Sequence, residues 1–159
     1  GRPAFTNVSY EEGMRLRGLL YGDDGSSRSA AEGAARHPGD RVVSWCMFTD
    51  PQVAVVGRVP DEGDGDLVTV TKPLTHAQRR TEWGHPDGAL MLTAGRSDGR
   101  LVGAVFVARE AGELAHSMVD AVQRGAHWTV LARLVGIHPT YGELVAGAAW
   151  GLGEKREGG

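Results

Sequence analysis

Residues 99–126, GRLVGAVFVAREAGELAHSMVDAVQRGA, carry the strongest pattern of secondary structure in the chain. The first part of this stretch is an apolar run rich in valine, which predicts a β-strand over residues 100–108. Its second part predicts a helix over residues 110–124 that ends at Gly125. The apolar stripe of this helix, at i, i+4, i+7 and i+8, consists of Leu114, Met118, Ala121 and Val122. A strand followed at once by a helix is therefore the centre of the expected fold.

More strands precede this stretch. Residues 88–95, GALMLTAG, are separated from the strand at 100–108 by RSDG, a turn sequence that predicts a β-hairpin. Similar apolar runs bounded by turn formers predict strands at residues 41–48, 52–59 and 66–74. Five strands in succession without long helices between them predict an antiparallel sheet, and the helices that follow predict an α+β fold with helices packed on one face.

The remaining segments complete the expected organisation of the chain. Residues 1–22 form a lead-in segment with a short helix capped by Ser9, and residues 23–40 form a flexible loop. Residues 41–152 form the α+β domain, in which Thr129 and Thr140 begin two further helices, the last ending near Trp150. Residues 153–159 are expected to be a disordered tail.

Composition excludes several classes of protein. The chain has 159 residues, which suits one compact domain, and its 17 basic and 20 acidic residues give a net charge of −3. Its basic residues are scattered, so neither nucleic acid nor a membrane is an expected partner. With one cysteine, Cys46, no disulfide can form within the chain, and a buried, inert thiol is expected. No apolar segment is long enough to span a bilayer, and a cytoplasmic location is expected. The chain does not begin with Met, so both a natural protein and a piece of a longer one are considered.

The segment HPTYGE, residues 138–143, supports two interpretations. Thr140 and Glu143 have the spacing of a capping box, in which the glutamate bonds to the backbone at the start of a helix. Alternatively, His138, held in an extended pose by the following proline, has one ring nitrogen oriented by Glu143 and the other facing outward. That arrangement would make His138 and Glu143 an acid–base pair that works near neutral pH.

Other candidate sites are weaker. His76, His85 and His116 lack the close spacing of metal ligands, so no metal site is expected. No phosphate-binding loop, complete dinucleotide fingerprint or GxSxG nucleophile elbow is present in this sequence. The four tryptophans are expected in the core or an interface, with Trp83 and Trp150 as alternative pocket residues.

Three segments together resemble one family: CMFTDPQVAVVG at residues 46–57, the stretch at 99–126, and IHPTYGE at residues 137–143. They are similar to the C-terminal interface (dimerisation) domain of the FAD-dependent pyridine nucleotide-disulfide oxidoreductases, which include glutathione, lipoamide and mercuric ion reductases. The matching residues are Cys46, Phe48, Thr49, Pro51, Val56, Gly57, Gly103, Ala111, Glu113, His138, Pro139, Thr140 and Glu143. The resemblance extends from residue 5 to residue 150.

This resemblance implies an antiparallel sheet backed by helices, and a homodimer formed through it. The histidine and glutamate of the family map onto His138 and Glu143. In the family, the histidine reaches across the dimer to a redox disulfide beside the flavin of the other subunit and shuttles its proton, while the glutamate orients the ring.

The chain also departs from the family. It lacks the flavin and nicotinamide domains and the CxxxxC disulfide, so no cofactor is expected in this chain alone; FAD and NAD(P)H would belong to further domains. Residues 58–66, RVPDEGDGD, replace a family helix with a short acidic turn.

Three functions therefore stay open. The first is an interface domain that contributes His138 and Glu143 at the dimer seam but performs no redox chemistry by itself. The second is a stand-alone domain recruited as a cofactor-independent acid–base enzyme, a cyclase or isomerase acting on a small molecule. The third is a dimerisation module without catalysis.

Overall fold

The structure is a computed structural model that describes residues 5–21, 42–84 and 88–158. The chain divides into two compact units, residues 1–43 and 44–159, and each is described by itself. The first contains helix α1 (Thr6–Tyr21). Ser9 was expected to cap this helix, but it lies inside the first turn, where its amide donates to the Phe5 carbonyl at 3.0 Å. The loop predicted at residues 23–40 lies outside the described residues.

The second unit contains the five-stranded antiparallel sheet that the sequence predicts. Its strands are β1 (Ser44–Met47), β2 (Gln52–Gly57), β3 (Leu67–Pro73), β4 (Ala89–Gly95) and β5 (Leu101–Ala108). They lie in the order β1-β2-β5-β4-β3, and every neighbouring pair is antiparallel. Strand β5, which comes from the segment at residues 99–126, is at the centre. The predicted α+β class is confirmed.

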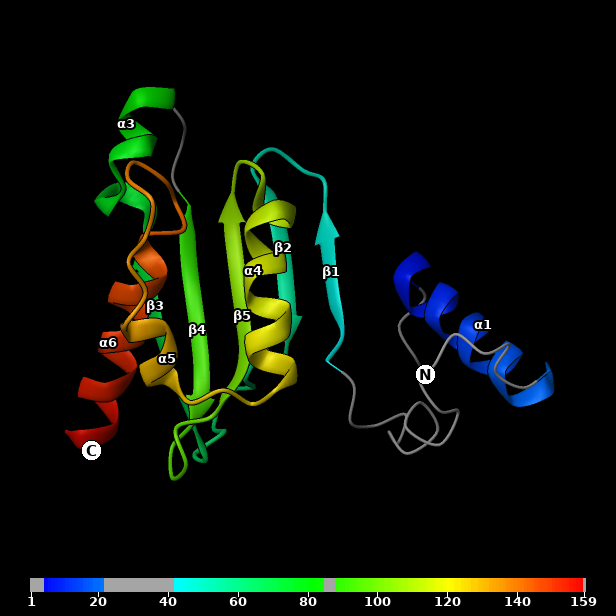
Figure 1. Cartoon of the computed structure of the whole chain (residues 1–159). Coiled ribbons are helices and arrows are strands. Elements are labelled where there is room, and N and C mark those ends of the chain that lie inside the picture. The colour runs from blue at the N-terminus through cyan, green and yellow to red at the C-terminus, as the bar shows by residue number, and fades with distance from the viewer. Residues whose placement is uncertain (1–4, 22–41, 85–87, 159) are drawn as a thin grey trace. The chain divides into compact units, whose positions relative to one another are not determined.

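Helices cover one face of this sheet (Figure 1). They are α4 (Ala111–Gln123), α5 (Trp128–Ala132) and α6 (Leu144–Glu157). Helix α4 packs on β2 and β5, while α6 packs on β3 and β4. The largest fully buried side chains between the sheet and helices include Leu90, Leu92, Met118 and Leu152. A 3₁₀ turn, η1 (Leu74–His76), and a short helix, α3 (Gln78–Trp83), follow β3, and the sequence analysis did not predict them.

The buried face of α4 differs in part from the predicted stripe. Met118 and Val122 are buried as expected, but the other two buried positions are Ala111 and Ala115. Leu114 and Ala121, which were expected to face the sheet, are only half-buried. Small side chains at the contact let a helix axis approach a sheet closely, so the alanines take the inner positions.

Helices α5 and α6 do not begin where the sequence analysis placed them. His127 caps α5, because its side chain accepts a hydrogen bond from the Thr129 amide. Helix α6 begins at Leu144 rather than Thr140 and continues past Trp150. The tail predicted to be disordered from residue 153 is therefore helical as far as Glu157.

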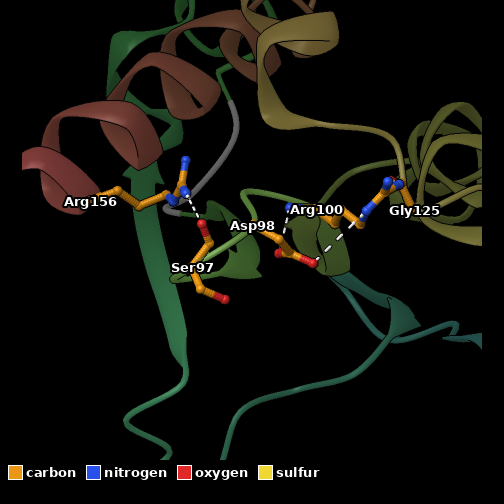
Figure 2. A network of polar contacts seen from close by, with 5 residues as sticks. All are labelled: Ser97, Asp98, Arg100, Gly125 and Arg156. Carbon is orange, nitrogen blue, oxygen red and sulfur yellow. Dashed lines mark hydrogen bonds and ion pairs between the residues drawn. The ribbon is translucent and has the colours of Figure 1, made fainter.

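The last turn of α6 is attached to the hairpin that joins β4 to β5 (Figure 2). The guanidinium of Arg156 donates to the Ser97 carbonyl at 2.9 Å. Within the hairpin, Asp98 accepts from the Arg100 amide at 3.0 Å, and the Arg100 side chain donates to the Gly125 carbonyl at 2.9 Å. These contacts hold the end of α6 and the turn after α4 against the same hairpin. They fix the C-terminal end of α6, and Glu143 lies immediately before the N-terminal end of the same helix.

Candidate functional site

The loop between α5 and α6 carries the HPTYGE segment. Proline has no amide hydrogen and restricts the residue before it, so the helical conformation cannot continue through His138 and Pro139. The peptide bond between these two residues is cis, as is the bond between Asp50 and Pro51. His138 therefore lies in irregular backbone shortly before α6.

Glu143 binds the ring of His138. The distance between His138 Nδ1 and Glu143 Oε2 is 2.8 Å. A carboxylate oxygen only accepts hydrogen bonds, so Nδ1 carries the hydrogen that it donates. In the neutral ring this leaves Nε2 as an acceptor. The structure thus brings together the two residues that the sequence analysis selected.

The alternative capping box is not formed. The hydroxyl of Thr140 donates to the Ile137 carbonyl at 2.6 Å instead of accepting from the start of the helix. Glu143 occupies the position before the first helical residue, and its side chain makes no capping hydrogen bond. The interpretation of Glu143 as a partner of the Thr140 backbone is therefore wrong.

The pair is accessible in the single chain. The side chain of His138 is 68% exposed, and that of Glu143 is 22% exposed. Three neighbouring apolar residues are also exposed, and we call Leu134, Val135 and Ile137 the apolar loop surface. Val135 is 97% exposed and Ile137 is 79% exposed. Large apolar side chains grouped in water are typical of an interaction site.

Tyr141 anchors the middle of this loop. Tyr141 is only 6% exposed, whereas the residues beside it are half-buried and residues 133–138 are exposed. Burial raises the pKa of the Tyr141 phenol, and the positive charges of Arg109, Arg79 and Arg80 act in the opposite direction. Tyr141 was not among the residues predicted from the sequence. An aromatic residue between turn formers was the available signal.

The other candidate residues do not join the site. His76 lies in η1 and His116 in α4, and both side chains are exposed. Within residues 5–21, 42–84 and 88–158, no three His, Cys, Asp or Glu side chains are placed to hold a metal ion. His85 and the side chain of Trp83 fall outside the described part of the chain. Trp128 is buried against α6, whereas Trp150 is exposed, with their rings edge to face at 6.0 Å.

Cys46 is half-buried rather than fully buried as expected. Burial raises the pKa of its thiol, and a hydrogen bond with the Gly112 backbone partly offsets this increase. A raised pKa lowers the thiolate fraction at neutral pH, so the thiol is a poor nucleophile there. Cys46 is consistent with a structural position beside α4.

The described strands do not form the parallel arrangement in which a doubly wound sheet binds a flavin or nicotinamide dinucleotide. Dinucleotides bind at the carboxyl ends of parallel strands, where the strand order reverses. All strand pairs in this sheet are antiparallel, so that arrangement does not arise in the described residues.

No helix in the described residues has both the length and the apolar composition to cross a bilayer.

The antiparallel sheet, its one-sided helical layer and the HPTYGE segment with its exposed His138 define an interface domain of the disulfide reductase type. The family model "Pyridine nucleotide-disulphide oxidoreductase, dimerisation domain" matches residues 43–149, and the chain belongs to this family.

Known proteins similar to the chain agree with this assignment. A dihydrolipoyl dehydrogenase of Halobacterium salinarum is 33% identical over 112 residues, covering 69% of this chain and 24% of that protein. The structure of LpdA from Mycobacterium tuberculosis has a TM-score of 0.65 and 31% identity, covering 69% of this chain and 25% of that one. The HOCl-induced flavoprotein disulfide reductase RclA from Escherichia coli shares the fold, with a TM-score of 0.74 and 21% identity. The match covers 92% of this chain and 32% of that one. The chain thus spans about a quarter of the curated relative's length.

Proposed function

We propose that the chain joins a second copy through the apolar loop surface, and that His138 acts at this seam as an acid–base group oriented by Glu143. Its reaction partner would be a dithiol or disulfide held by the other subunit of a disulfide reductase. The observation that carries the proposal is the 2.8 Å contact between His138 Nδ1 and Glu143 Oε2 on a ring that is 68% exposed. Membership of a dimerisation-domain family supports the self-association.

The acid–base chemistry follows from the hydrogen bond that His138 Nδ1 donates to Glu143. With Nδ1 donating to Glu143, Nε2 of the neutral ring can take a proton from a thiol and return it later. The carboxylate stabilises the imidazolium that forms in between. A thiolate, not a thiol, is the nucleophile in disulfide exchange, so removal of this proton activates the sulfur. No electron-transfer step is assigned to these residues.

The dimer seam matters for this acid–base role because the His138 ring is exposed to water in the single chain. Charge interactions are weak in water and become stronger when a second surface excludes it. Leu134, Val135 and Ile137 would provide a dry surrounding once a partner covers them. The apolar loop surface thus supports both the dimerisation and the acid–base parts of the proposal.

The stand-alone cyclase or isomerase is the weaker alternative. Such an enzyme needs a concave site that buries most of its substrate. A ring that is 68% exposed favours a site completed by another subunit over one enclosed by the chain itself.

The acid–base role is tested by His138→Gln in the assembled disulfide reductase. Loss of a general acid–base group is expected to lower kcat by about 10²- to 10⁴-fold. His116→Gln is the matched control, since His116 is an exposed histidine on α4. A His138→Gln enzyme that keeps the unmodified rate would contradict the catalytic role and leave a dimerisation module without catalysis.

A further inference from the structure

Gly136, two residues before the HPTYGE segment, lies close against Glu143 at the end of that segment. A Cβ atom placed on Gly136 would lie 2.8 Å from Glu143 Cα and 2.9 Å from Glu143 Cβ. Carbon atoms that are not bonded to each other prefer separations of about 3.5–4.0 Å. Only glycine allows this approach without displacing the glutamate. The requirement comes from close contact, not from a left-handed backbone conformation.

The displaced atoms would be Cα of Glu143 and the Cβ attached directly to it. Backbone atoms cannot turn away as the end of a long side chain can, so α6 or the loop would have to shift. Helix α6 is held at its other end by the hydrogen bond from Arg156 to Ser97. The loop is held by buried Tyr141 and by the hydrogen bond from Thr140 to Ile137. The contact between Gly136 and Glu143 therefore sets where the carboxylate stands relative to the ring of His138.

We infer that Gly136 is a positioning residue for the His138–Glu143 pair. By letting the glutamate backbone approach, it keeps the carboxylate on Nδ1 and leaves Nε2 open toward a reaction partner. Its significance for catalysis rests on the proposed function. The geometric effect itself can be measured without catalysis, so the two ideas can fail separately.

The test compares the tautomers of the His138 ring by ¹⁵N NMR of the full chain, at about pH 9, where an ordinary imidazole is neutral. In the unmodified chain, the tautomer with hydrogen on Nδ1 is expected to dominate. In Gly136→Ala, the ratio of this tautomer to the other should fall about tenfold, as expected when a hydrogen bond to a charged group is lost. Glu143→Ala should produce the same fall, and the double variant should add little to it.

Gly147→Ala is the matched control. Gly147 is exposed on α6, and a Cβ atom there would have no neighbour within 4 Å. The same glycine-to-alanine change should leave the tautomer ratio of His138 unaltered. A Gly136→Ala chain with the unmodified ratio would overturn the inference.

A second measurement needs no variant and decides the matter if Gly136→Ala does not fold. The α protons of Gly136 and Glu143 should show a nuclear Overhauser effect in the unmodified chain. Its absence would overturn the inference as well. If the tautomer result holds but His138→Gln leaves the reductase rate unchanged, the positioning role stands and the proposed function fails.

Discussion

At the scale of single residues, one glutamate could have served two partners. Its spacing from Thr140 predicts a capping box, and its spacing from His138 has no standard meaning. In the structure Glu143 binds His138, and the Thr140 hydroxyl donates to the Ile137 carbonyl. Sequence identifies both candidates, but competition between local hydrogen bonds is decided by the loop geometry. The importance of Gly136 depends on the same geometry and was not predicted.

Cys46 provides a prediction about pH. Burial raises the pKa of its thiol, so fewer molecules carry the reactive thiolate at about pH 8 than for an ordinary cysteine. Alkylation by iodoacetamide should be slower in the folded chain than in the same chain unfolded in urea. The pKa of the Cys46 thiol is higher in the folded chain than in the unfolded chain, so its protonated form contributes to the stability of the folded chain. This contribution is fully present below the ordinary thiol pKa and is lost as pH rises through the folded value.

The control for this measurement is a free cysteine-containing peptide, whose rate should be unaffected by urea. Equal alkylation rates for the folded and unfolded chain would show that the thiol is not shielded.

At the scale of elements, the strands were easier to predict than the helix ends. Apolar runs separated by turn formers identify all five strands, because the pattern depends on local sequence. The end of α6 depends on packing instead. Gly151 and Gly153 resemble a stop signal, but a Cβ at Gly151 would lie 3.1 Å from Val70, and one at Gly153 would lie 2.6 Å from the Trp128 ring. These glycines allow close packing within the helix, and that role cannot be distinguished from a helix stop by sequence alone.

Arg156 is predicted to stabilise the C-terminal part of this helix. Arg156→Ala removes hydrogen bonds from a guanidinium to the Arg96 and Ser97 carbonyls, at 2.8 and 2.9 Å. The free energy of unfolding should fall by about 1 to 2 kcal/mol, measured by urea denaturation.

Arg124→Ala is the comparison for this change. Arg124 forms an ion pair with Asp120 on α4, and its side chain is 75% exposed. Loss of such an exposed pair should cost at most about 0.5 kcal/mol. Equal losses of stability in the two variants would mean that the hairpin contacts of Arg156 contribute no more than a surface pair.

At the scale of the whole molecule, the family could be predicted because three separated motifs occur in the right order. Composition and periodicity alone support only an α+β sheet with helices on one face. The apolar loop surface was not predicted, since Leu134 and Val135 look like part of the helix expected after Thr129 and Ile137 opens the IHPTYGE segment. They are exposed because α5 ends at Ala132, and the loop then carries them outward.

Dimerisation through this surface can be broken by one charge. Val135→Asp places a carboxylate where the proposed seam excludes water, and burial of an unpaired charge is unfavourable. Val59→Asp makes the same change at another exposed valine, in the turn after β2, outside the apolar loop surface. The Val135 variant should be a monomer and the Val59 variant a dimer.

The most direct test of the central claim is the mass of these three chains by sedimentation equilibrium. The unmodified chain and Val59→Asp should both sediment at twice the chain mass of 16.9 kDa, and Val135→Asp at 16.9 kDa. An unmodified chain that sediments at 16.9 kDa, or a Val135→Asp chain that remains a dimer, would contradict a seam formed around His138.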